Sequence, residues 1–471
     1  MRQIRLRRTD PAATVGQVLL DHYTIGARDM TSPAGSEADL LKQAAIYSFR
    51  ARMDKQASEG PVFVKAKDST VTDVQGKEYI DFNSGQMCSA LGHNHPTIVA
   101  AIREACDTML HAHSSHYNVK EIELATRLGR LMPDPLQKSL FGESGSDANE
   151  MAMMIARKFT GGHEVASPHI SFHGLSDATR SVTFAGWHAN HGQSAAGTCA
   201  IVAPYCYRCP LNQTFPKCEL ACLKTSFELL DAQSTGRPAA VITEPLFSAG
   251  GVVEPPPGWL KRLQELCRER HMLLIVDEEQ TGLGKLGTMF GFERDGIVPD
   301  IVTVAKHFGG GVGISAVTTT AEIEDKVVSD GYAATHSHSN DPLICAAGVA
   351  SLDVVEGEDV PAKARRIGAQ MLERLQALMQ RYDMIGDIRG RGQLTGIELV
   401  RDRQTKEPAT DEGRRIGKLC FGRGLIFSLR RGGSVLRFVP PATTTPDQID
   451  RAMDLLGAAI EEVSTARKAV G

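Results

Sequence analysis

A lysine and two acidic residues directly follow apolar stretches that read as short strands. Lys306 comes just after the apolar run at residues 301–304, and Glu244 and Asp277 end two earlier runs of the same kind. Burying an ammonium group is costly unless it is paired, neutralised or used covalently. A single lysine at a strand end is by default a surface residue. The company of two carboxylates instead favours a reactive amine, and we interpret Lys306 as a lysine that forms a Schiff base.

The elements around these residues predict where they meet. Continuous apolar strands that alternate with amphipathic helices are typical of a parallel sheet covered on both faces. In such sheets, ligands bind beyond the carboxyl ends of the strands. We therefore expect an α/β fold in which Glu244, Asp277 and Lys306 converge on one crevice.

Size and composition limit the classes of protein. The chain has 471 residues, a net charge of −4 and ten cysteines, with no apolar run as long as a membrane span. These features exclude a nucleic-acid or membrane-surface protein and favour a cytoplasmic enzyme without a disulfide framework. We expect four segments: an N-terminal arm (1–45), the N-terminal part of a small domain (46–91), a large domain with a mostly parallel central sheet (92–342), and a C-terminal small α/β domain (343–471).

The cofactor that suits such a lysine is pyridoxal 5'-phosphate (PLP). PLP needs a lysine for its aldehyde carbon, a carboxylate for its pyridine nitrogen, a flat group against its ring and donors for its phosphate. The Gly/Ser turn at residues 142–146 follows a predicted strand and precedes a helix, which is a geometry that binds phosphate. Substrate carboxylates are usually bound by arginine, whose planar fork matches them.

Several stretches together resemble one family. Asp-Glu-Glu-Gln-Thr-Gly at 277–282 is similar to the Asp-Glu-x-Gln-Thr-Gly signature of class III aminotransferases of PLP fold type I. The stretches 141–150, 172–174 and 243–245 resemble the phosphate loop and two further blocks of that family. The resemblance covers roughly residues 60–465.

Within the family, the chain looks most like 2,2-dialkylglycine decarboxylase. The stretches that carry this likeness are 81–87, 339–343, 385–392, 402–409 and 436–441.

The resemblance implies a role for each matching residue. Lys306 would bind the cofactor and move the proton, Asp277 would pair with the pyridine nitrogen, and Gln280 would bond the phenolic oxygen. Ser144, Gly145 and Ser146 would hold the phosphate together with Ser337 of a partner subunit, so that a homodimer or a dimer of dimers is implied. Phe172 would stack on the ring with His173 packed behind it, and Arg437 would bind the substrate carboxylate. Gln86 would hold that carboxylate in the orientation for its loss, and Glu244 would orient Gln280 and Arg437.

Four positions depart from the decarboxylase pattern. Phe172 stands where that pattern has tryptophan, Ala249 where it has serine, and residues 336–338 where it has Thr-Thr-His. Glu279 replaces a small residue and adds a carboxylate beside the cofactor. These positions line the substrate pocket, so the substrate and the reaction type are left open.

Four cysteines form a separate cluster, C-x2-C-x8-C-x3-C, at Cys206, Cys209, Cys218 and Cys222. This spacing fits a structural tetrahedral zinc site, and the alternatives are free buried thiols or adventitious disulfides. The nearby His188 and His191 are not spaced as ligands of that site, and we expect them in a loop near the pocket mouth.

The function expected from these motifs is decarboxylation-dependent transamination of an amino acid, with a 2-oxo acid such as pyruvate as amino acceptor. The alternatives are a plain aminotransferase, a PLP-dependent epimerase, and a non-catalytic scaffold. Retention of Lys306, Asp277 and Arg437 argues against the scaffold.

Overall fold

The structure is a computed structural model that describes residues 36–48, 61–186, 192–334 and 336–468. The chain consists of two compact units, residues 1–65 with 72–77, and residues 66–71 with 78–471. In the described part of the first unit, helix α2 (Glu37–Tyr47) is capped by Ser36, whose side chain accepts a hydrogen bond from the Asp39 amide. Most of the predicted N-terminal arm, and the loop with His188 and His191, lie outside the described residues.

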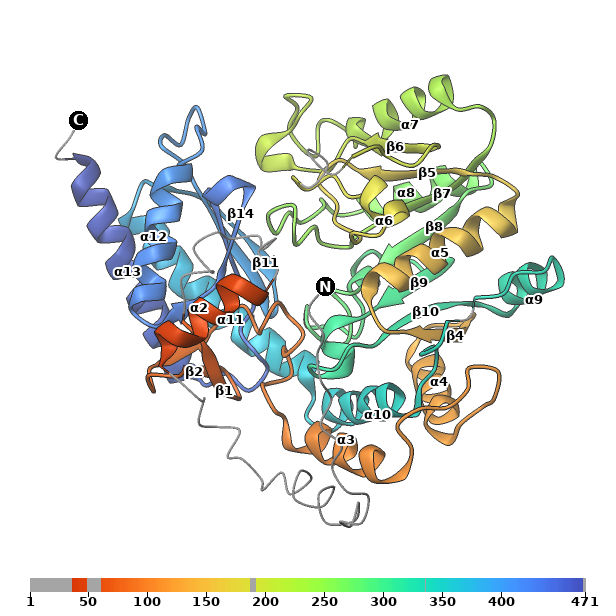
Figure 1. The fold of residues 1–471 in the computed structure, drawn as a ribbon. Helices are drawn as coiled ribbons and strands as arrows, with labels where there is room; N and C mark the ends of the chain where they lie inside the picture. Colours follow the sequence, from red (N-terminus) through yellow and green to blue (C-terminus); the bar gives the residue numbers. More distant parts are fainter. Residues whose placement is uncertain (1–35, 49–60, 187–191, 335, 469–471) are drawn as a thin grey trace, which may run out of the picture. The chain divides into compact units, whose positions relative to one another are not determined.

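A seven-stranded sheet forms the centre of the second unit (Figure 1). Its strands are, in spatial order, β4 (Leu136–Gly142), β10 (Ser315–Thr320), β9 (Ile301–Val304), β8 (Leu273–Asp277), β7 (Pro238–Thr243), β5 (Glu164–Pro168) and β6 (Thr198–Ile201). β10 runs antiparallel to β4 and β9, and all other neighbours are parallel. The predicted α/β fold with a mostly parallel central sheet is confirmed.

Alternate residues of the central strands point to two different cores. Ile242, Ile275 and Ile301 belong to one hydrophobic cluster, together with helix α5 (Gly145–Thr160) and helix α9 (Ala321–Ser329). Val276 and Val302 belong to the other cluster. The helices of that second face are α3 (Pro96–Thr108), α4 (Val119–Leu131), α7 (Ala221–Gln233), α8 (Trp259–Arg268) and α10 (Pro342–Gly357). Because successive side chains of a strand point to opposite faces, strands that are apolar throughout require helices on both sides.

Helix α5 has well-defined ends. The Ser144 side chain accepts a hydrogen bond from the Asp147 amide, and the Asp147 carboxylate accepts one from the Ser144 amide, which makes a capping box. Gly161 ends the helix in the left-handed region at φ 68°, which a residue with a Cβ adopts less readily. The start of α5 therefore stands at a fixed place beside the end of β4.

The C-terminal part forms a second core. Strands β11 (Ile385–Arg391), β12 (Leu394–Leu399), β15 (Val435–Phe438) and β14 (Ser428–Arg430) make an antiparallel sheet in that order. The helices α11 (Val360–Arg381), α12 (Thr410–Gly422) and α13 (Pro446–Lys468) pack with it, as do Ile80 and Phe82. Strand β3 (Glu78–Asp81) pairs in parallel with β13 (Leu425–Ile426). The predicted domain boundaries themselves stay a prediction.

The remaining elements are short. They are β1 (Phe63–Lys67), β2 (Thr70–Asp73), α6 (Asp177–Ser181), and the 3-10 turns η2 (Cys206–Arg208), η3 (Gly291–Asp295), η4 (Lys306–Gly309) and η5 (Arg431–Gly433). Among the described residues, no helix is both long and apolar enough to cross a membrane.

The packing predicts different costs for two leucine truncations in helices. Leu128 in α4 is fully buried, whereas Leu229 in α7 is 57% exposed. We expect Leu128→Ala to lower the free energy of unfolding by about 2–5 kcal/mol, because a buried truncation loses apolar burial and leaves a cavity. Leu229→Ala is the matched control and should cost much less. Urea unfolding followed by circular dichroism measures both, and equal midpoints for the two variants would contradict the packing.

Candidate active site

Lys306 follows the buried strand β9, from which it is separated by Ala305 alone. Its backbone is left-handed, with φ 57°, which is uncommon for a residue with a side chain and typical of functional positions. The Lys306 Nζ lies 2.7 Å from Glu279 Oε2, and the lysine side chain is 18% exposed. Burial lowers the pKa of Lys306, but the charges of Glu279 and Asp277 outweigh it and raise the pKa overall.

Asp277, the last residue of β8, is a buried carboxylate with three hydrogen-bond donors. His173 Nδ1 and Asn149 Nδ2 both lie 2.8 Å from Oδ2, and the Glu279 amide donates to Oδ1 at 3.1 Å. Burial alone would raise the pKa of Asp277, but the hydrogen bond from His173 and the charges of His173 and Lys306 lower it overall. An ionised carboxylate in a dry site is what a protonated ring nitrogen requires.

Asn149 is a residue whose role the sequence reasoning missed. Its Nδ2 lies within 2.9 Å of three acceptors: Asp277 Oδ2, Glu279 Oε1 and the His173 carbonyl. Its Oδ1 accepts a hydrogen bond of 2.7 Å from Thr303 Oγ1. Asn149 therefore ties β8, β9 and the His173 loop to helix α5. The only signal in the sequence was a polar residue on the buried side of the helix after the Gly/Ser turn.

The start of helix α5 has the properties of a phosphate site. No acceptor in the described part of the chain takes the backbone N–H of Gly145 or Ser146, so the helix N-terminus offers free donors. A Cβ added at Gly145 would lie 2.0 Å from Glu279 Oε2, so a side chain there would displace the Glu279 carboxylate. Ser144 serves as the helix cap, and Ser146 Oγ accepts a hydrogen bond from the Leu175 amide. These donors fit the phosphate of the expected cofactor.

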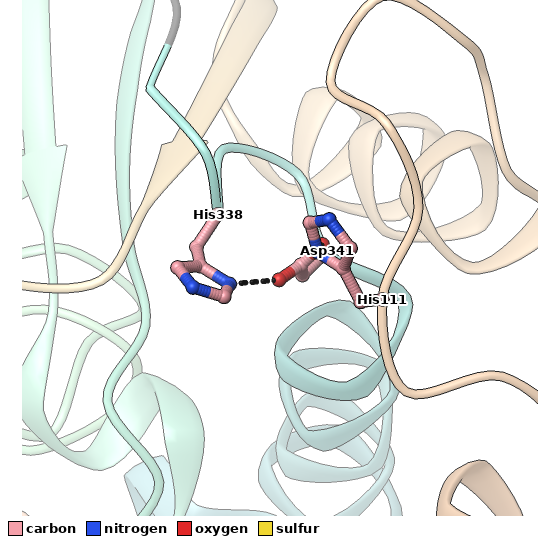
Figure 2. Close-up of side chains that lie close together, drawn as sticks. All are labelled: His111, His338 and Asp341. Atoms are coloured by element: carbon pink, nitrogen blue, oxygen red, sulfur yellow. Dashed lines mark hydrogen bonds and ion pairs between the residues drawn. The ribbon is translucent and has the colours of Figure 1, made fainter.

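Asp341 contacts His338, the residue after Ser337, and also His111; Figure 2 shows these three side chains close together. His338 Nδ1 lies 2.6 Å from Asp341 Oδ2, and His111 Nδ1 lies 2.7 Å from Oδ1. Among the described residues, these three form the only group of three or more His, Cys, Asp or Glu side chains whose possible ligand atoms all lie within 4.8 Å of one another. The two hydrogen bonds account for their closeness. Ser337 itself is exposed, and its contact with a partner subunit stays a prediction.

Arg437 on β15 is a buried guanidinium without a counter-ion. It is 1% exposed, its Nε and Nη1 donate to Ser428 Oγ and Ser248 Oγ at 2.9 Å, and Nη1 lies 3.3 Å from Gln280 Oε1. Its Nη2 has no hydrogen-bond partner among the described residues, and no carboxylate of that part of the chain pairs with it. Burial and the charge of Arg430 hold the pKa of Arg437 well below its usual range. This arrangement attracts an anion from outside.

Glu244 supports the site through the backbone. Its Oε1 accepts a hydrogen bond from the Phe172 amide at 3.0 Å, and its Oε2 accepts one from the Ser248 amide at 3.1 Å. Burial raises the pKa of Glu244 to about 8, with a contribution from Asp277. Because the Ser248 hydroxyl also accepts from Arg437, Glu244 holds the guanidinium indirectly.

Two further residues predicted for the site, His173 and Gln86, lie in contrasting surroundings. His173, which the sequence places behind the cofactor ring, lies against Asp277 as its hydrogen-bond partner. Gln86 stands on an exposed left-handed turn with φ 67°, whereas Asp277 and Arg437 are buried. The part of Gln86 in positioning a carboxylate stays a prediction.

A second lysine was also missed by the sequence reasoning. Lys285 is completely buried, and its Nζ has no hydrogen-bond partner in the part of the chain that the structure describes. Burial, together with the charges of Lys306 and Arg437, lowers the pKa of Lys285 to about 7. Lys285 adds to the positive potential around the site. It does not stand at a strand end, so sequence patterns do not single it out.

The four cysteines line one small cavity of about 20 Å³. All four are free thiols, which does not support the disulfide alternative. Cys206 is the first residue of the 3-10 turn η2, Cys209 directly follows that turn, and Cys222 lies in the first turn of α7. Burial raises the pKa of Cys206 to about 11, and the other three sulfurs contribute. Among these described cysteines, no three of the sulfur atoms all lie within 4.8 Å of one another.

The lack of a counter-ion predicts an unusual effect of removing Arg437. Apolar replacement of buried charged groups, measured for ion pairs, is often neutral or stabilising by about 1–4 kcal/mol. We expect Arg437→Met to keep or raise the thermal midpoint while abolishing the binding of a simple carboxylate, measured by calorimetry. Arg374→Met, at a surface ion pair, is the control and should bind carboxylate normally. A large fall of the midpoint in Arg437→Met would contradict this account of the guanidinium.

Comparisons with known proteins agree with the site. The family model "Aminotransferase class-III" matches residues 53–460. The chain is 38% identical to an uncharacterized aminotransferase of Schizosaccharomyces pombe over 85% of this chain and 90% of that protein, and 36% identical to the leucine/methionine racemase of Thermococcus litoralis over 86% and 92%. Among solved structures, an amine transaminase from an uncultivated Pseudomonas species, in its PLP-bound form, matches with TM-score 0.82 and 31% identity over 89% of this chain and 98% of that one. Because the family model matches residues 53–460, the chain belongs to the class III aminotransferase family.

Proposed function

We propose that the protein is a PLP-dependent aminotransferase that moves an amino group between an amino acid and a 2-oxo acid. The observation that carries this proposal is Arg437, an unneutralised buried guanidinium bonded to Gln280, which is in the same strand-end loop as Asp277. Both substrates of such an exchange share a carboxylate that this guanidinium can bind. The family and the PLP-bound neighbour support PLP as the cofactor.

The residues present would hold that cofactor as follows. The N–H groups of Gly145 and Ser146 would bind its phosphate, and Asp277 would hold a proton on its ring nitrogen. Phe172 would lie against the ring, and Gln280 would donate to its phenolic oxygen. When bound, PLP supplies an electron-withdrawing ring that stabilises negative charge at the substrate Cα.

The chain's own groups then decide what happens at Cα. Arg437 binds the substrate carboxylate and fixes the orientation of the Cα bonds. The neutral amine of Lys306 takes the proton from Cα. It returns a proton after the negative charge on the substrate has redistributed. Asp277 stays ionised throughout, because His173 and Asn149 keep their hydrogen bonds to it.

Two reaction branches differ in the bond that breaks. Loss of the Cα proton is supported by relatives named aminotransferases and by one named a racemase. Loss of CO₂ is the second candidate, and the likeness of residues 81–87 to 2,2-dialkylglycine decarboxylase supports it. That branch depends on Gln86, which is exposed in the structure. We favour proton loss.

One pair of substrates separates the branches. We expect L-alanine with a 2-oxo acid to give a new amino acid without CO₂, and 2-aminoisobutyrate, which has no Cα proton, to be inert. Chromatography of amino acids and trapping of CO₂ from carboxyl-labelled substrates measure both, with Lys306→Ala as the inactive control. Release of CO₂ from 2-aminoisobutyrate would establish the decarboxylase branch. Loss of optical activity of L-alanine without a 2-oxo acid would establish the epimerase alternative.

We also propose a homodimer and a structural zinc ion. The exposed Ser337 supports the dimer, because the family resemblance gives this residue to the phosphate site of a partner subunit.

The cavity lined by four free thiols supports the zinc. Burial raises the pKa of Cys222. The indole N–H of the fully buried Trp259 partly offsets this rise. The sulfurs would have to draw closer around the ion than they stand in the structure.

Metal analysis tests the zinc site. We expect about one zinc per chain, lost in Cys218→Ser together with a lower thermal midpoint, because a tetrahedral thiolate site crosslinks its loop. Cys106→Ser, at an exposed free cysteine outside the loop, is the control and should keep the zinc. Protein produced with added zinc that contains none would contradict the site.

A further inference from the structure

Glu279 is a buried carboxylate in direct contact with the reactive lysine. Its Oε2 lies 2.7 Å from Lys306 Nζ, its side chain is 8% exposed, and its Oε1 accepts a hydrogen bond of 2.9 Å from Asn149. It follows the ring-nitrogen carboxylate Asp277 by two residues, at a position where the resembling decarboxylase has a small side chain. A small side chain there would leave Lys306 without this partner.

The placement of Glu279 is unfavourable by itself. Two carboxylates, Asp277 and Glu279, share the single amide nitrogen of Asn149 in a largely buried site. Asp147 adds a third negative charge nearby, and a Cβ at Gly145 would displace the Glu279 carboxylate. Like charges at such distances destabilise a fold and are concentrated at functional sites.

The electrostatic surroundings suit a group that gains and loses a proton near neutrality. Burial and the charges of Asp277 and Asp147 raise the pKa of Glu279, Lys306 opposes them, and the net result is about 7. Glu279, Asp277 and Cys88 raise the pKa of Lys306 against the effect of burial, and Glu244, Lys285 and His307 also interact with the lysine charge. Because the pKa of Glu279 is far above that of an ordinary carboxylate, Glu279 accepts a proton from Lys306 more readily than an exposed carboxylate would.

We propose that Glu279 is the proton partner of Lys306: it holds Lys306 Nζ protonated at rest, and accepts that proton when the nitrogen must act as a base. In the step, the Nζ–H bond breaks and the Oε2–H bond forms, so an ion pair becomes a neutral amine beside a neutral carboxylic acid. The reverse transfer restores the ion pair. This inference rests on the proposed function and deepens it, because a neutral lysine is needed to remove a Cα proton but not to lose CO₂.

A pH titration of the PLP-loaded protein tests the proposal. The visible absorption band of PLP linked to Lys306 reports whether the linking nitrogen is protonated. A carboxylate at 2.7 Å stabilises the protonated form, so the band should persist to higher pH in the wild type. Because an opposite charge at this range shifts a pKa by about 1–3 units, we expect Glu279→Gln to move the midpoint down by at least about 1 unit. Glu279→Asp should recover part of the shift.

Glu278→Gln is the matched control. Glu278 is equally buried in the same loop, but its carboxylate faces Thr281 and the Phe292 amide instead of Lys306. We expect its midpoint to equal that of the wild type. In addition, Glu279→Gln should slow removal of the Cα proton from L-alanine about 10- to 100-fold in single-turnover mixing, without a change in the concentration that half-saturates the protein.

The outcomes separate the two claims. An unchanged midpoint and an unchanged proton-removal rate in Glu279→Gln, with a normal band, would overturn the role of Glu279 and leave the proposed function in place. A wild-type protein that develops no band with PLP, and no mass increase after borohydride reduction, would overturn the proposed function and this inference with it. A shifted midpoint that Glu279→Asp partly restores supports the proton partnership.

Discussion

The structure depends on keeping ionisable side chains stable in a buried region. Glu244, Asp277 and Lys306 follow three adjacent parallel strands, and the two carboxylates are almost completely buried. Each has its own partners: Asn149 and His173 bond to Asp277, two backbone amides donate to Glu244, and Lys306 pairs with Glu279. The strand register sets this geometry, since Asp277 pairs with Thr303 and Thr303 in turn donates to Asn149. A slip of one residue would turn the carboxylate away from its donors.

The anion-binding side of the site has a different origin. Arg437 belongs to the C-terminal antiparallel sheet, but its hydrogen bonds go to Ser248 and Gln280, which follow strands of the central sheet. The site is complete only when both cores have formed and packed together. Its guanidinium lacks a carboxylate partner within the described residues, and the Lys285 Nζ has no hydrogen-bond partner there. Such buried groups cost stability, and the proposed binding of an anionic substrate would explain why they are kept.

Proximity of acids to the lysine gives the site its chemical character. Glu279 contacts Lys306 directly, and in our proposal it exchanges a proton with that lysine. A Cβ at Gly145 would displace the same carboxylate, so the proposed phosphate site and the proposed proton exchange are sterically linked. Changes at either position will be felt at the other.

Local patterns in the sequence determined most of the architecture. The apolar runs predict β7, β8 and β9 within one or two residues of their observed limits, because burial on both faces requires continuous apolar side chains. The same runs identified Lys306, Asp277 and Glu244, since a strand end is a local feature. The partners of these residues were decided by the tertiary structure. Asn149 is separated from Asp277 by 128 positions and Arg437 from Gln280 by 157, and a hydrogen bond between distant segments leaves no periodic trace in the chain. For that reason the bond of His173 to Asp277, the isolation of Lys285 and the contact of Glu279 with Lys306 emerged only from the packed fold.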